Sequence, residues 1–182
     1  QAQLDARPMS ALQWRVVALC WLVNLLDGFD LLAISFAAPA IVKAWQLEPT
    51  TLGIVFSSGL VGMTAGSLLL GPAADRIGRR RMIILATAVL GLSTLLTAAA
   101  GTVAQLVMLR VFTGVAIGAL LPSLNTLVAE YTPDARRNLA IAFMHLGYPV
   151  GGIAGGALAG LLIPSAGWQA VFVAGGPRPL PP

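Results

Sequence analysis

Long apolar stretches, separated by short polar connectors, make up most of the chain. A helix of roughly 20 predominantly apolar residues crosses a hydrocarbon core about 30 Å thick. Five stretches reach that length, at residues 16–42, 52–74, 82–100, 103–129 and 139–163, and a partial sixth covers 168–176. Because lipid satisfies no backbone hydrogen bonds and these stretches are too long for barrel strands, we predict an all-α, polytopic membrane helix bundle over residues 16–176.

Basic residues in the connectors give this bundle an orientation. Arginines precede the first stretch and follow the second and the fourth, whereas the other side of the bundle offers only Lys43. Positively charged loops remain in the cytoplasm, so we expect residues 1–15 to be a cytoplasmic N-terminal segment. A cleaved signal peptide is the competing interpretation of the first stretch, although apolar residues resume at Leu31 and four further stretches follow.

Composition supports insertion into a lipid bilayer. Hydrophobic residues make up 57% of the chain and charged residues 10%, whereas a soluble domain carries about 25% charged residues. The mean hydropathy is +0.84. The net charge of +4 does not indicate a nucleic-acid partner, because the basic residues form short clusters between apolar stretches. Cys20 is the only cysteine, so no intramolecular disulfide is possible.

The sequence contains no recognisable catalytic constellation. There is no nucleophile–base pair, no metal-ligand spacing and no phosphate-binding loop, and His145 is the only histidine. The glycine pairs at 151–152 and 155–156 follow no strand, so they do not predict a dinucleotide site. We therefore expect a protein that is not an enzyme and that uses no metal or cofactor.

The two ends of the chain suggest a fragment. The sequence begins at Gln1 without an initiator methionine, and the last apolar stretch gives way to a proline-rich tail at 177–182. Proline cannot continue a helix, because it lacks the N–H donor and clashes with the preceding turn. We expect a truncated chain with a non-native tail; a processed N-terminus and an unusual natural tail are the alternatives.

Two acidic residues lie in the middle of the first stretch, Asp27 and Asp30, within the tetrapeptide DGFD. An ionisable side chain at the centre of a membrane helix costs on the order of 2.5–3.5 kcal/mol, so each one needs a reason. A spacing of three residues places both carboxylates on one helix face, where mutual repulsion and burial favour the uptake of a proton. We predict a proton-coupling role, the alternative being a helix break whose acids face water or a structural arginine.

Arg110 is the only arginine or lysine inside an apolar stretch, near the outer end of the fourth. Gly114, Gly118 and Pro122 follow it at intervals of four, which predicts a stripe of small residues that another helix or a substrate approaches closely. A guanidinium stays charged and binds carboxylates through two hydrogen bonds. We expect Arg110 to neutralise one of the acids or to bind an anionic substrate, unless it extends to the outer interface.

His145 lies in the fifth stretch, which is rich in glycine. A lone histidine there is either a hydrogen-bonded core residue or a contact for substrate or protons, and we keep it as a substrate-binding candidate. The glycines indicate close helix packing, as in carriers that rock between two states or as in any tightly packed bundle.

The connector at 71–81, GPAADRIGRRR, is the most specific segment of the chain. Gly78 is free to adopt a positive φ in a tight turn. Asp75 is placed to cap a helix N-terminus or to pair with Arg79, and the run of arginines holds the connector in the cytoplasm.

This connector resembles the signature between the second and third helices of the major facilitator superfamily. Arg110, Gly114 and Gly118 look like that family's fourth-helix motif, and the segment from Glu130 to Arg137 is similar to the one that ends the fourth helix. The resemblance covers residues 12–176 and implies the N-terminal six-helix half of the fold, with the sixth helix truncated. It also implies a conformational gate, formed by Gly71, Asp75, Arg76, Gly78, Arg79, Arg80, Glu130 and Arg137.

Within the superfamily, DGFD is similar to the D-G-x-D motif of the aromatic acid:proton symporters. The resemblance implies a multi-pass protein of a bacterial inner membrane that imports a benzoate- or hydroxybenzoate-type anion with protons by alternating access. Asp27 and Asp30 would be required, with Arg110 as the carboxylate or coupling partner. The C-terminal half of such a carrier is missing, so we expect no transport from this polypeptide alone. The alternatives are another organic-acid or drug-efflux carrier of the superfamily, or a non-transporting membrane bundle.

Overall fold

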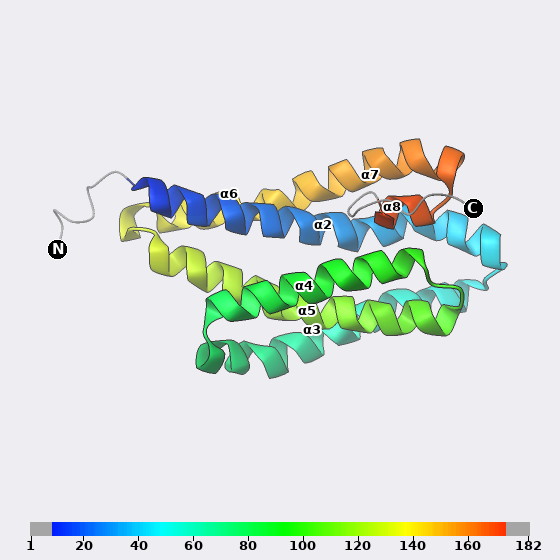
Figure 1. The fold of residues 1–182 in the computed structure, drawn as a ribbon, viewed down its shortest axis with the longest axis horizontal. Coiled ribbons are helices and arrows are strands. Elements are labelled where there is room, and N and C mark those ends of the chain that lie inside the picture. The colour runs from blue at the N-terminus through cyan, green and yellow to red at the C-terminus, as the bar shows by residue number, and fades with distance from the viewer. Residues whose placement is uncertain (1–8, 174–182) are drawn as a thin grey trace.

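The computed structural model describes residues 9–173, and its regular structure is entirely helical, which confirms the predicted all-α class (Figure 1). The predictions for residues 1–8 and for the tail at 174–182 lie outside this range. The helices are α2 (Ala11–Trp45), α3 (Pro49–Ile77), α4 (Arg79–Ala98), α5 (Val103–Tyr131), the 3-10 turn η1 (Asp134–Arg136), α6 (Arg137–His145), α7 (Gly147–Ala166) and α8 (Gln169–Val173).

Within residues 9–173, five helical segments are long and apolar enough to cross a membrane, with η1, α6 and α7 forming one of them. Large apolar side chains cover much of the outside: Leu69 and Leu161 are each 72% exposed, and Ile153 is 74% exposed. Water would disfavour such a surface, whereas hydrocarbon accommodates it.

The ends of the helices follow from local chemistry. Ser10 caps α2 in a reciprocal arrangement with Gln13, and Thr102 caps α5 by accepting from the backbone N–H of Gln105. Gly78 joins α3 to α4 with φ of 92°, so the positive φ expected of this glycine is present. A side chain at that position would strain the turn, which explains why glycine is required there.

The fifth apolar stretch is interrupted at Leu146, between α6 and α7. Pro149 has no N–H to donate to the carbonyl of His145, and its ring crowds the preceding turn. The segment still continues in one general direction (Figure 1), so it crosses the bundle as two helices in sequence.

The bundle consists of two groups of helices. In one group α3 and α4 pack along α5, and in the other α6, α7 and α8 pack around α2 (Figure 1). Glycine permits the closest contacts: a Cβ at Gly114 or Gly118 would overlap the backbone of α3 at Gly59 or Met63. The small-residue stripe predicted on α5 therefore receives a neighbouring helix, α3. The two groups meet where α2 and α8 approach α4 and α5, and this is where the buried charges lie.

Candidate functional site

Asp27 and Asp30 lie one turn apart on α2 and are almost completely buried, with 1% and 2% of their surface exposed. The helix continues without interruption from Ala11 to Trp45, so DGFD is not a helix break. The carboxylates do not face water either. The remaining alternative, pairing with an arginine, applies to one of the two acids only.

Asp30 forms an ion pair with Arg110 of α5, with 3.2 Å between Oδ2 and Nη1. Two hydroxyls of α4 complete this network: Thr94 donates to Asp30 Oδ1, and Arg110 Nη2 donates to Thr97 Oγ1 at 3.1 Å. The guanidinium also lies 5.9 Å from the ring centre of Phe172 in α8. The ion pair therefore connects four helices at the junction of the two groups.

Arg110 is 4% exposed, so its side chain does not extend to a membrane interface. Ionisable groups within a bundle are expected to face its interior and to pair with one another. A buried pair of this kind is fragile, because removal of one partner leaves an uncompensated charge in a medium of low dielectric constant.

Asp27 differs from Asp30, because neither of its carboxylate oxygens has a hydrogen-bond partner among the described residues. Its neighbour Asn24, one turn earlier, donates from Nδ2 to the carbonyl of Met144 at 2.9 Å, and Oδ1 of that asparagine is also unpartnered. Burying an isolated ionised carboxylate is costly. The structure thus separates the two acids into one that is charge-paired and one that is not.

His145 lies apart from this network. Its Nε2 is 3.0 Å from Oδ1 of Asn125, on the exposed side of α5 and α6. Across residues 9–173, no hydrogen bond or ion pair links His145 to Asp27, Asp30 or Arg110. The structure therefore does not bring the two predicted substrate-binding residues together.

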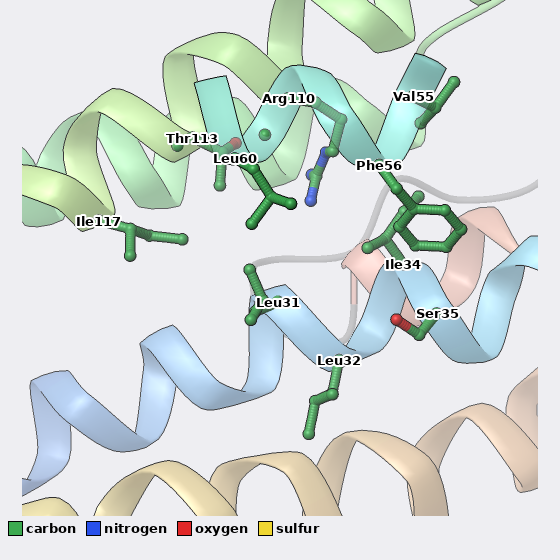
Figure 2. Close-up of a pocket in the computed structure, with 12 residues that line it drawn as sticks. Leu31, Leu32, Ile34, Ser35, Val55, Phe56, Leu60, Arg110, Thr113 and Ile117 are labelled. Carbon is green, nitrogen blue, oxygen red and sulfur yellow. The ribbon is translucent and has the colours of Figure 1, made fainter. Parts of the chain in front are cut away.

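Two cavities flank the ion pair. The larger, of about 180 Å³, lies between α2, α3 and α5, and Arg110 borders it (Figure 2). The smaller, of about 140 Å³, lies between α2, α4 and α8, and Asp30, Thr94 and Phe172 border it. Arg110 thus faces one cavity while its carboxylate partner faces the other, so the pair separates two spaces that small molecules or water could enter.

The predicted gate residues gather only in part. Arg79 at the start of α4 pairs with Asp75 of α3 at 3.2 Å and also contacts Glu130 near the end of α5. Arg137 donates from Nε to the carbonyl of Ala129 at 3.1 Å and pairs with Asp134. The contacts of Arg79 fasten the α3–α4 turn to the end of α5, whereas those of Arg137 lie within the connection from α5 to α6. Among the residues that the structure describes, Arg76 and Arg80 join no such ion pair, and a Cβ at Gly71 would meet no atom within 4 Å.

The uncharged polar residues of the site were not predicted from the sequence. Asn24, Thr94, Thr97 and Thr113 are all buried, whereas the residues predicted from the cost of burial are all ionisable. A signal was present: Asn24 precedes Asp27 by three residues, as Thr94 precedes Thr97, which places each pair on one helix face.

Residues 20–177 match the family model described as the Major Facilitator Superfamily. The gallate transporter of Pseudomonas putida is 42% identical over 177 residues, which are 97% of this chain and 39% of that protein. The 4-hydroxybenzoate transporter PcaK of Pseudomonas aeruginosa is 41% identical over 180 residues, 99% of this chain and 40% of the relative. The 3-(3-hydroxy-phenyl)propionate transporter of Escherichia coli is 40% identical over 164 residues, which are 90% of this chain and 40% of that protein.

Among solved structures, the inward-open xylose transporter XylE of E. coli has the same fold, with a TM-score of 0.79 at 19% identity. The match covers 90% of this chain and 45% of that structure. The chain spans about 40% of the length of the curated relatives it matches.

Proposed function

The chain belongs to the major facilitator superfamily, and from this premise we propose that it is the proton-coupling part of a carrier that imports an aromatic carboxylate. One observation carries the proposal: the buried pair of Asp30 and Arg110 lies next to a second buried acid, Asp27, which has no partner. The relatives named as transporters of gallate and 4-hydroxybenzoate support the substrate class.

The ion pair provides a route from proton binding to anion binding. While Asp30 is ionised, it neutralises the charge of Arg110 across 3.2 Å. A proton that adds to Oδ2 of Asp30 removes this neutralisation, so the guanidinium becomes a net positive group that attracts a carboxylate. Loss of that proton restores the pair and weakens anion binding. Proton and anion therefore bind together and leave together.

Asp27 offers a second position for a proton. Its carboxylate is buried without a hydrogen-bond donor or a base among the residues described, and a protonated acid is the form that burial tolerates. Protonation and deprotonation of Asp27 would accompany access of the site to water on one side and then the other, as alternating access requires.

The gate residues and a second half complete the proposed carrier. The contacts of Arg79 with Asp75 and Glu130 fasten the α3–α4 turn to α5 in this state, and their breakage would accompany the opposite state. The relatives are longer than this chain, and carriers of this kind place substrate between two halves. We expect a multi-pass protein of a bacterial inner membrane with a cytoplasmic N-terminus, which does not transport without a C-terminal half.

Uptake by a chimera tests this proposal. Residues 1–173 would be joined to the part of P. aeruginosa PcaK that follows the position aligned with Val173, and uptake of radiolabelled 4-hydroxybenzoate would be measured in cells with and without a protonophore. We expect uptake that the protonophore abolishes, and none from the 182-residue chain alone. Asp30→Asn should abolish uptake, whereas Glu48→Gln, which neutralises an exposed acid, should not. Normal uptake by Asp30→Asn at normal membrane levels would contradict the coupling role.

A further inference from the structure

The cavity between α2, α3 and α5 has mostly apolar walls, with Ser35 on the α2 side and a polar end formed by Arg110 and Thr113 (Figure 2). Leu31 and Ile34 of α2, Val55 and Phe56 of α3, and Ile117 of α5 supply apolar surface. Arg110 and Thr113 of α5 border the cavity together, and a spacing of three residues places them on one face of that helix.

Both residues at the polar end have a buried donor without an acceptor. Thr113 is 2% exposed, and its Oγ1 has no hydrogen-bond partner within residues 9–173. The same is true of Nε of Arg110, whose Nη1 and Nη2 are bound to Asp30 and Thr97. An unsatisfied buried donor costs about 1–3 kcal/mol, so an acceptor in this cavity would recover energy that the bundle alone does not.

The dimensions of the cavity suit one aromatic ring. Its volume is about 180 Å³, whereas an apolar protein cavity of about 150 Å³ accepts benzene. A carboxylate has two oxygens and is the natural partner for two adjacent donors. A monocyclic aromatic acid therefore matches both parts of the cavity: the ring matches the apolar walls, and the carboxylate matches the polar end.

We propose that this cavity binds the ring of the transported aromatic acid, and that Thr113 is a specificity-determining residue whose hydroxyl donates to the substrate carboxylate beside Arg110 Nε. The identity of the ligand rests on the proposed function. Because Nε is the free donor, the substrate carboxylate can lie beside it while Nη1 stays next to Asp30. Protonation of Asp30 then strengthens this binding, so the guanidinium is shared by the proton site and the substrate site. The contacts named here come from this chain, so we expect measurable binding by this chain alone, while a C-terminal half would complete the site in the whole carrier.

The test is binding of 4-fluorobenzoate to the 182-residue chain in lipid nanodiscs, followed by ¹⁹F NMR titration. Thr113→Val removes the hydroxyl and keeps the shape of the side chain. It should weaken binding by roughly tenfold or more, the loss of one hydrogen bond to a charged group. Thr126→Val is the matched control on the same helix, since that hydroxyl bonds to the carbonyl of Pro122 and is exposed. It should leave the affinity unchanged.

A second variant tests the apolar part of the cavity. Gly59 borders the cavity, and a Cβ there would lie 3.8 Å from the carbonyl oxygen of Arg110, an ordinary contact. Gly59→Ala therefore adds a methyl group to the cavity wall without a clash. It should weaken competition by gallate more than competition by benzoate, because the bulkier ring needs the lost space. Gly53→Ala, on the same helix with no atom within 4 Å of its Cβ, should change neither.

The outcomes separate this inference from the proposed function. Absence of binding at millimolar 4-fluorobenzoate, by a chain whose helical circular dichroism is intact, would overturn the inference. An affinity of Thr113→Val for 4-fluorobenzoate equal to that of wild type, or unchanged competition by gallate in Gly59→Ala, would also overturn it. Weaker binding of 4-fluorobenzoate by Thr113→Val, together with weaker competition by gallate in Gly59→Ala, supports the inference even if the chimera fails to transport. In that case the proposed proton-coupled uptake is contradicted and the binding site is not.

Discussion

The carboxylate of Asp30 and the guanidinium of Arg110 are 80 residues apart in sequence and 3.2 Å apart in the bundle. Both side chains are at least 96% buried, so neither charge is stabilised by water. Each charge is therefore stabilised by the other, and neutralising one of them leaves the other buried without a counter-charge. This dependence underlies both the stability and the proposed coupling of the protein.

Loss of one partner should destabilise the bundle more than loss of both. Arg110→Gln leaves Asp30 buried and unpaired, and we expect a loss of about 3–5 kcal/mol in unfolding free energy. Adding Asp30→Asn to this variant should recover much of the loss, because no buried charge then remains. Unfolding of the four proteins of this cycle in nanodiscs or detergent gives the coupling energy directly. Additive effects of the two substitutions would mean that the pair does not form.

Asp27→Asn should separate function from stability. The carboxylate of Asp27 has no described partner to lose, and the neutral amide is of similar size. We expect an unfolding free energy equal to or higher than that of wild type, with proton-coupled uptake by the chimera abolished. Uptake of radiolabelled 4-hydroxybenzoate and unfolding would be measured on the same preparations. Uptake at the wild-type rate would remove the carboxylate role of Asp27.

Substitution of the glycines between α3 and α5 should damage the packing of the bundle. A Cβ at Gly114 would overlap the backbone of Gly59, and one at Gly118 would overlap that of Met63. Gly118→Ala should cost about 1–3 kcal/mol of unfolding free energy, because rigid backbone has to move. Gly160→Ala is the control, since no atom lies within 4 Å of its Cβ. That variant should be neutral or slightly stabilising, by up to about 1 kcal/mol.

Glu130→Gln should affect transport more than folding. The side chains of Asp75 and Glu130 are 66% and 54% exposed, and ion pairs on such surfaces contribute only about 0–1 kcal/mol. If these contacts hold the α3–α4 turn in one of two states, the variant should change the uptake rate of the chimera while unfolding stays within about 1 kcal/mol of wild type. Unchanged uptake kinetics, with Glu48→Gln as the reference, would exclude a gating role for Glu130.

The sequence predicted the helical bundle because its apolar stretches are long and the charges between them are few. It also indicated which residues are costly to bury, since the hydropathy and charge of each residue follow from its type and need no structure. It could not assign the partner of Arg110, because Asp27 and Asp30 share a helix face and only the rotation of α2 against α5 decides which acid is within reach. Asp30 is paired and Asp27 is not.

The buried threonines of the site could not be predicted for a different reason. Threonine is inexpensive in a membrane helix, because its hydroxyl bonds to the carbonyl four residues earlier, as Thr97 does to Ser93 at 2.8 Å. Composition therefore does not separate a structural threonine from one that contacts a charge. The interruption at Leu146 was likewise hidden, because hydropathy does not register the hydrogen bond that Pro149 fails to make.

Substrate-driven proton movement by the chimera in proteoliposomes, followed with a pH-sensitive dye trapped inside, tests the central claim most directly. We predict that external 4-hydroxybenzoate acidifies the lumen when the chimera is present, and that Asp27→Asn and Asp30→Asn each abolish the acidification while Glu48→Gln preserves it. Accumulation of labelled 4-hydroxybenzoate without any acidification, or full acidification by both aspartate variants, would contradict the account.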